Sequence, residues 1–147
     1  MKYQVIKTYT PEMGLSCAFR QWRAKSHCRF LHGYALGVKI VFEAEQLDAK
    51  NWVYDFGGMK WIKDFLVEYF DHTTLIAEDD PELLSFKALA QKDLIQLKIL
   101  PQVGCEKFAE WIYTHLAPQV QAETKGRVLI KSVEVFEQGA NSSAILA

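Results

Sequence analysis

The residues of this chain best suited to chemistry are Cys28, His32, the Asp71-His72 pair and the late glutamate Glu137. Cysteine and histidine titrate closest to neutral pH, and a carboxylate can orient either of them. Such a set suits proton transfer on a small heterocycle, with the thiol or an imidazole as the base. The strands and helices between residues 28 and 137 must then bring these side chains together.

Composition excludes several classes of protein. The chain has 147 residues, of which half are hydrophobic, so we expect a real core and one domain over residues 1–147. The net charge of −1 argues against a nucleic-acid partner held by a general positive field. Apolar runs are too short for a membrane span or a signal peptide, so we expect no membrane partner.

The cysteine count points to a compartment. Cys17, Cys28 and Cys105 are an odd number of thiols in a chain of ordinary core size. Free thiols in a reducing environment are the simplest interpretation, which places the protein in the cytoplasm.

Hydrophobic periodicity predicts an α+β fold. Alternation predicts strands over Lys2–Thr10, Leu15–Trp22, Leu36–Ala44, Leu97–Leu100 and Arg127–Glu137, with a short extended tail after Gly139. Helical spacing predicts one helix capped by Asp55 and beginning near Gly57, and two more over Asp79–Ala90 and Gly104–Val120. This order is typical of helices on one face of an antiparallel sheet. Its exposed edges could be paired by oligomerisation.

Four motifs in order carry a resemblance to a known family. They are Cys28-x-x-x-His32-Gly33-Tyr34, Val53-Tyr54-Asp55-Phe56-Gly57, Phe70-Asp71-His72-Thr73-Thr74-Leu75 and Val135-Phe136-Glu137. The chain resembles the 6-pyruvoyl-tetrahydropterin synthase family from about Lys2 to its C-terminus. The spacing of Cys28 and His32 is closest to the queuosine-pathway branch, the 6-carboxy-tetrahydropterin synthases.

The resemblance implies a fold and an assembly. The fold is the tunnelling fold, in which a four-stranded antiparallel sheet carries two longer helices on one face. Its subunits join their sheets into a barrel, usually a homohexamer of two trimers. The site lies between subunits and binds a pterin.

The resemblance also implies roles for individual residues. Glu137 takes the position of the glutamate that grips the amino-imino edge of the pterin ring. Cys28 matches the thiol base, and Asp71 with His72 matches a proton relay contributed by a neighbouring subunit. Glu106 falls where the family has a further substrate-binding glutamate at a helix start, although the usual proline-threonine before it is absent.

The chain departs from the family at the metal. The family holds zinc with three histidines, whereas here Phe19 and Tyr34 occupy two of those positions and only His32 remains. A catalytic zinc normally needs three protein ligands. We therefore expect no tightly bound cofactor.

Structural interpretations of the same residues stay open. Cys28 could be a buried apolar thiol, and Asp71-His72 a polar helix end at which the histidine meets the helix dipole. Glu137 could be a solvated carboxylate at a strand end. Four cationic residues lie close together in the sequence: Arg20, Arg23, Lys25 and Arg29. They either lie on a solvated loop or flank the mouth of a pocket, where they would bind a phosphate or carboxylate.

These expectations lead to two functional hypotheses. The first is a lyase that resembles 6-pyruvoyl- or 6-carboxy-tetrahydropterin synthase and acts on dihydroneopterin triphosphate or a related pterin without a complete zinc site. The second is a zinc-free homologue that binds a pterin or purine-like ring without turnover. Metal content and a co-purified ligand would separate them.

Overall fold

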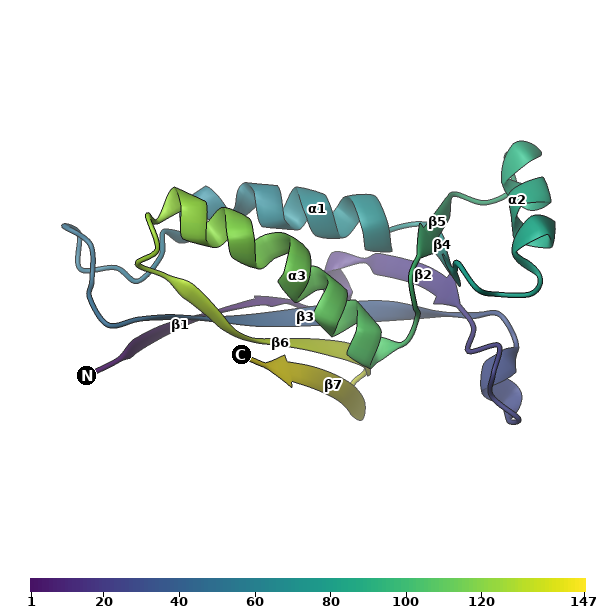
Figure 1. The fold of residues 1–147 in the computed structure, drawn as a ribbon, viewed down its shortest axis with the longest axis horizontal. Coiled ribbons are helices and arrows are strands. Elements are labelled where there is room, and N and C mark those ends of the chain that lie inside the picture. Colours follow the sequence, from purple (N-terminus) through teal and green to yellow (C-terminus); the bar gives the residue numbers. More distant parts are fainter.

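A seven-stranded sheet forms the centre of the computed structural model, which describes all residues from Met1 to Ala147 (Figure 1). The strands are β1 (Tyr3–Tyr9), β2 (Leu15–Phe19), β3 (His32–Ala44), β4 (Thr73–Ala77), β5 (Leu97–Leu100), β6 (Leu129–Gln138) and β7 (Asn141–Leu146). Their order is β5-β4-β2-β3-β6-β7, and β1 pairs with β3. Strand β3 is long enough to pair with β2 over residues 32–36 and with β1 over residues 38–44.

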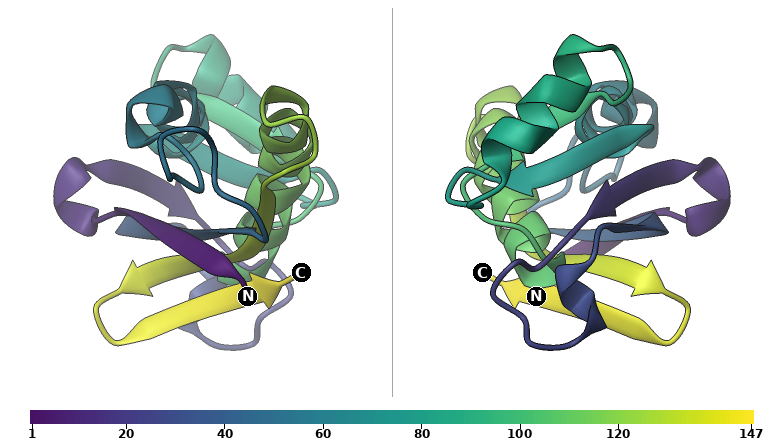
Figure 2. Two further views of the ribbon diagram at one scale, coloured as in Figure 1. Left: turned by 90° about the vertical axis from the view of Figure 1, so that its left-hand side faces the viewer. Right: turned by 90° about the vertical axis from the view of Figure 1, so that its right-hand side faces the viewer.

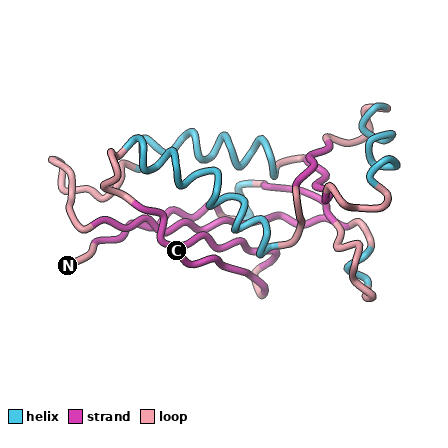
Figure 3. The backbone as a smooth tube through the Cα atoms, in the orientation of Figure 1, coloured by secondary structure: helices cyan, strands magenta, loops and turns pink.

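Two longer helices cover one face of this sheet. Helices α1 (Lys60–Phe70) and α3 (Cys105–Glu123) run side by side over the sheet, whereas α2 (Leu83–Gln91) stands apart beyond β4 and β5 (Figures 1 and 2). Figure 3 shows α1 and α3 as a layer above the strands. The α+β class and the two longer helices on one face are as predicted.

The prediction of four antiparallel strands was wrong. The sheet has seven strands and is mixed, because β4 pairs parallel with both β2 and β5. All five residues of β4 are buried, so its sequence lacks the alternation that reveals a half-exposed strand. The tail after Gly139 is also a true strand, because β7 pairs antiparallel with β6.

The core lies between the sheet and the two helices. Leu36, Val38, Ile40 and Phe42 alternate along the inner face of β3 and are almost completely buried. Each such side chain contributes about 1.5–3 kcal/mol when it leaves water. The core side chains form one continuous cluster of 30 residues, so β3 cannot slide relative to the helices without exposing its inner face.

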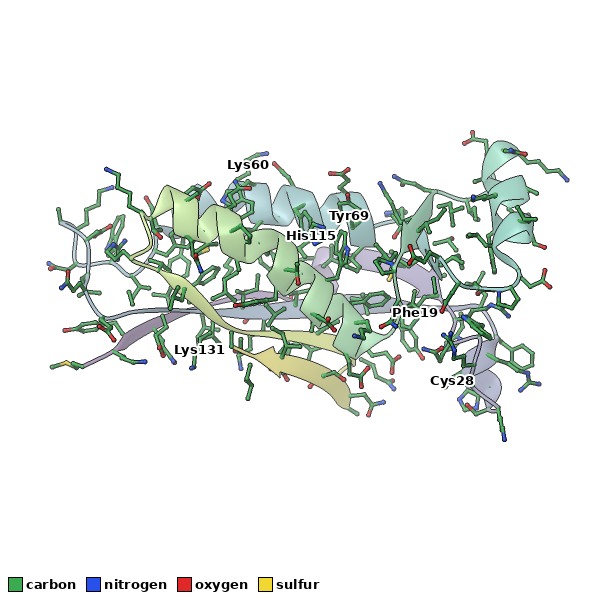
Figure 4. The ribbon with its side chains drawn as sticks, in the orientation of Figure 1. Phe19, Cys28, Lys60, Tyr69, His115 and Lys131 are labelled. Carbon is green, nitrogen blue, oxygen red and sulfur yellow. The ribbon has the colours of Figure 1, made fainter.

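Aromatic contacts join the two helices. Phe65 of α1 stacks on Trp111 of α3 with ring centroids 5.3 Å apart, and Trp111 lies 4.0 Å from His115. Tyr69 packs edge-on against Trp111 at 4.5 Å, and Figure 4 shows Tyr69 and His115 at this contact. His115 Nδ1 lies 2.8 Å from the carbonyl oxygen of Trp111, which gives this histidine a structural role.

Other element boundaries differ from the predictions in ways that affect the site. Strand β3 begins at His32 instead of Leu36, and β2 ends at Phe19 instead of Trp22. Asp55 does act as a cap, since its Oδ1 accepts a hydrogen bond from the Gly57 N–H at 2.8 Å ahead of α1. None of the helices is both long and apolar enough to cross a bilayer.

Candidate functional site

The site begins where the inner face of β3 extends past the core. His32 and Tyr34 follow the same alternation as the buried Leu36, so their side chains share its face. Phe19 of β2 pairs directly with His32. The Tyr34 ring centroid lies 5.5 Å from that of Phe19 and 5.1 Å from that of His32, so the three side chains form one cluster.

A pocket of about 480 Å³ opens beside this cluster. Its walls come from β2 and the loop after it, from β3, from the start of α3 and from the ends of β6 and β7 that face each other. It brings together most of the residues singled out in the sequence: Phe19, Cys28, His32, Tyr34, Glu106 and Glu137. Figure 4 shows Phe19 and Cys28 at this same end of the molecule, where α3 begins.

Cys28 lies on a single 3₁₀ turn, His27–Arg29, in the loop that leaves β2. The Ser26 Oγ accepts a hydrogen bond from the Cys28 N–H at 3.4 Å, and the Cys28 carbonyl accepts one from the Gln21 N–H at 2.9 Å. Its thiol is free and exposed, whereas Cys17 and Cys105 are buried. The interpretation of Cys28 as a buried apolar thiol is therefore wrong.

Short polar contacts join Phe30, His32 and Tyr34. His32 Nδ1 lies 2.6 Å from the carbonyl oxygen of Phe30, which can only accept, so Nδ1 carries a hydrogen. His32 Nε2 lies 2.7 Å from the Tyr34 hydroxyl, so these two side chains fix each other's position in the pocket wall.

The glutamates influence their neighbours in the pocket. Burial and then the carboxylate of Glu137 raise the pKa of Tyr34, so its phenol is neutral at pH 7. Burial, with Glu137 and Glu106 as further causes, raises the pKa of Cys105 to about 12. Cys105 is consequently a neutral thiol in the pocket wall, and Cys28 is the thiol that solvent reaches.

Helix α3 enters the site through a glycine. Gly104 has a φ of +119°, a conformation that residues with a Cβ rarely adopt. This turn directs Cys105 and Glu106 from the first turn of α3 into the pocket wall.

Asp71 and His72 do not line this pocket. They follow α1 on the other side of β2, where His72 has an 82% exposed side chain. Its Nδ1 lies 2.8 Å from Asp71 Oδ1, and its N–H donates to the Ser16 carbonyl at 2.6 Å. His72 also has a φ of +56°, which is unusual for a non-glycine residue and is maintained by this bond. The pair is therefore a fixed, outward-facing unit within one chain.

Sequence reasoning missed the polar wall opposite the aromatic cluster. Asn141, Ser142 and Ser143 of β7 line the pocket, because the turn after β6 returns the chain beside Glu137. The signal for this wall was the turn at Gly139-Ala140-Asn141 followed by two serines. Gln21 and Ser26 add further uncharged polar groups from the loop that carries Cys28.

The three arginines of that loop have partners within the chain. Arg20 pairs with Asp80 at 2.6 Å, and Arg23 pairs with Asp79 at 2.7 Å. The Arg29 guanidinium donates to the carbonyl oxygens of Lys25 and Ser26. The two ion pairs fasten the loop to the turn after β4.

Comparisons with known proteins assign the chain to a family. A sequence model of the 6-pyruvoyl tetrahydropterin synthase family matches residues 8–147. The chain belongs to this family. It is 25% identical to a 6-carboxy-5,6,7,8-tetrahydropterin synthase of Aquifex aeolicus over 158 aligned positions, which cover 97% of each protein. A protein of the same description from Rickettsia felis is 35% identical over 60 residues, or 40% of this chain and 44% of that protein.

Solved structures share the fold. An uncharacterised protein from Wolinella succinogenes matches with a TM-score of 0.85 and 22% identity over 99% of this chain and 98% of its own. The 6-pyruvoyl tetrahydropterin synthase of Plasmodium falciparum matches with a TM-score of 0.69 and 17% identity over 98% and 96%. The fold is therefore the tunnelling fold of these synthases.

The residues at the expected metal position do not fit a three-histidine zinc site. Phe19 has no donor atom, and the Nε2 of His32 lies in hydrogen-bond contact with the Tyr34 hydroxyl at 2.7 Å. No three His, Cys, Asp or Glu side chains of the chain are grouped so that they could hold a metal ion. A structural or catalytic zinc normally has at least three protein ligands.

Proposed function

We propose that this protein is a pterin-processing lyase that resembles 6-carboxy-tetrahydropterin synthase and works without a tightly bound zinc. The observation that carries the proposal is that Cys28 and Glu137, 109 positions apart in the family-like pattern of motifs, line one pocket. A base and an anchoring carboxylate in one cavity are what a reaction on a bound heterocycle requires.

Glu137 is the proposed anchor of the ring. It continues the inner face of β6 after Val133 and Val135 and stands where the pairing of β6 with β7 is irregular. A carboxylate can accept two parallel hydrogen bonds from the amino and imino groups of a pterin, which is a strong, directional contact. The half-buried position of Glu137 protects such a contact from water.

Cys28 is the proposed base. Its thiol is the one that is free, exposed and in the pocket wall, so it can reach a substrate side chain whose ring is held by Glu137. Its thiolate would take a proton from that side chain. No step is assigned to a metal, and the other pocket groups supply hydrogen bonds instead.

Asp71 and His72 are proposed to serve the pocket of a neighbouring subunit. Their outward position within one chain supports this arrangement, because in a monomer the exposed His72 would lie away from the pocket that binds the substrate. The sheet also presents unpaired edges at β1 and β7, which a second copy could pair. We propose a homohexamer, with the exposed thiol of Cys28 suiting the reducing cytoplasm.

Calorimetry with 7,8-dihydropterin tests the anchor. The wild-type protein should bind this ring, and Glu137→Gln should abolish detectable binding, because the amide turns one acceptor into a donor and leaves a mismatch of about 1–3 kcal/mol or more. Glu110→Gln is the control, since Glu110 pairs with Lys107 on the surface of α3 and lies outside the pocket. Equal affinities of wild-type protein and Glu137→Gln would refute the proposed function.

A further inference from the structure

We propose that Arg20 is a positioning residue, which fixes the Cys28 thiol in the pocket by joining the backbone beside Cys28 to the buried carboxylate of Asp80. This inference rests on the proposed function, in which Cys28 is the base. Arg20 does not itself line the pocket, so it acts through the loop that carries Cys28. Three observations support it: the contacts of the guanidinium group, a second contact from the next residue, and the burial of the anchoring carboxylate.

All three guanidinium nitrogens of Arg20 make hydrogen bonds. Nε and Nη2 donate to the two carboxylate oxygens of Asp80 at 2.8 and 2.6 Å. Nη1 donates to the carbonyl oxygen of Arg29 at 3.3 Å, and Arg29 directly follows Cys28 in the chain. A planar guanidinium presents its donors in fixed directions. The backbone beside Cys28 is therefore held at a set place relative to Asp80.

Gln21 adds a second contact to the same turn. Its N–H donates to the Cys28 carbonyl oxygen at 2.9 Å, and its side-chain Nε2 donates to the Val103 carbonyl oxygen at 3.5 Å. Val103 also lines the pocket, just ahead of the turn that starts α3. Two successive residues after β2 thus hold the carbonyl groups of two successive residues around the thiol, and they connect that turn to the opposite wall.

The anchor of this arrangement is buried within one chain. The Asp80 side chain is 1% exposed and that of Arg20 is 19% exposed. Asp80 also accepts a hydrogen bond from the Glu82 N–H and donates its own N–H to the Ala77 carbonyl oxygen. A two-point, charge-assisted pair that is shielded from water is strong and directional. The position of the Arg29 carbonyl is therefore determined by the fold of a single subunit.

The Cys28 turn needs such support because core packing does not hold it. None of the residues of the single 3₁₀ turn His27–Arg29 is buried, and the Cys28 thiol is exposed. A base must lie within hydrogen-bond reach of the proton that it takes. A displacement of about 1 Å can lower a rate on the order of 10²-fold. Hydrogen bonds to the backbone on either side of the thiol supply the precision that packing does not.

Arg20→Lys tests the inference through kcat. The ammonium group keeps a cation beside Asp80, so the protein should fold, but it cannot donate in all three directions that the guanidinium serves. With dihydroneopterin triphosphate, kcat should fall about tenfold or more while the Kd of 7,8-dihydroneopterin stays unchanged. Arg23→Lys is the matched control, because Arg23 pairs with the exposed Asp79 through one nitrogen, which a lysine can replace. Its kcat should equal that of the wild-type protein.

A second readout does not need turnover. Iodoacetamide alkylates exposed thiols, and mass spectrometry of the peptide that contains Cys28 measures its rate. With 7,8-dihydroneopterin at about ten times its Kd, the wild-type rate should fall to roughly a tenth, because only the free protein presents the thiol. Arg20→Lys should lose most of this protection at the same multiple of its own Kd, although the ligand is bound. A purely structural role would lower the stability in urea and leave both kcat and the protection unchanged.

The outcomes separate this inference from the proposed function. An Arg20→Lys protein with the kcat and the protection of the wild-type protein would overturn the positioning role. Wild-type protein that binds 7,8-dihydroneopterin without any protection of Cys28 would also overturn it, and the pterin site would remain. Wild-type protein that does not bind 7,8-dihydroneopterin would refute the proposed function itself, and the inference would fall with it.

Discussion

Arg20 and Asp80 lie 60 positions apart in the chain and form a two-point ion pair. Nε and Nη2 of Arg20 lie 2.8 and 2.6 Å from the two carboxylate oxygens of Asp80. Asp80 Oδ1 also accepts a hydrogen bond from the Glu82 N–H at 2.8 Å. The pair joins the start of the loop that carries Cys28 to the turn after β4, and it therefore sets one wall of the pocket.

Asp80→Asn should lower the free energy of unfolding by about 2–3 kcal/mol, because it removes charged hydrogen bonds and leaves Arg20 partly buried without its counter-ion. Urea denaturation would measure this loss. Asp64→Asn is the control, since its exposed pair with Lys60 should contribute less than about 0.5 kcal/mol. Similar small effects in both variants would contradict the structural role of the pair.

The same pair predicts a pH dependence of stability. Hydrogen bonds from Arg20 hold the pKa of Asp80 below its ordinary range. As pH falls, the unfolded chain therefore takes up this proton before the folded protein does. The contribution to stability is complete above about pH 4 and is lost as pH falls through the lower pKa of the folded state. The stability difference between wild-type protein and Asp80→Asn should shrink below about pH 4; a constant difference would show another origin.

Purified wild-type protein should contain well under one zinc per chain. Phe19 and Tyr34 lie beside His32 on one face of the paired strands β2 and β3. The double variant Phe19→His with Tyr34→His should therefore gain zinc, measured by elemental analysis after dialysis against a weak chelator. Circular dichroism would check that the variant is folded. One tightly held zinc per wild-type chain would mean that Cys28 or another group acts as a ligand.

Cys28→Ala should keep the affinity for 7,8-dihydropterin and lose turnover, because the thiol has no role in holding the ring. His72→Ala should have the same phenotype if its relay serves a neighbouring subunit. Mixing the two inactive variants under conditions that exchange subunits should then restore part of the activity, since some pockets receive both intact groups. Mixtures without any activity would contradict a shared site, and equal loss of binding in Cys28→Ala would make the thiol structural.

The protein should be an oligomer, most simply a hexamer, at micromolar concentration. The free edges of β1 and β7 provide the backbone groups for pairing, and Ile6 on β1 is a 51% exposed apolar side chain. Multi-angle light scattering would measure the mass. A stable monomer would contradict both the assembly and the shared site.

The sequence by itself determined much of the local structure and the chemistry of the site. Alternation along Leu36–Ala44 and helical spacing after Asp55 reflect which side chains must leave water, and that pattern depends on neighbouring residues alone. The sequence also identifies the candidate site residues, and it shows that the positions of two expected metal ligands hold Phe19 and Tyr34.

Tertiary structure decided what depends on partners far along the chain. The wholly buried β4 has no alternation, so only its parallel pairing with β2 and β5 identifies it as a strand. The arginines of the Cys28 loop looked free until the fold placed Asp79 and Asp80 beside them. The meeting of Cys28 and Glu137 in one pocket is also a tertiary fact, because it depends on the pairing of β3 with β6.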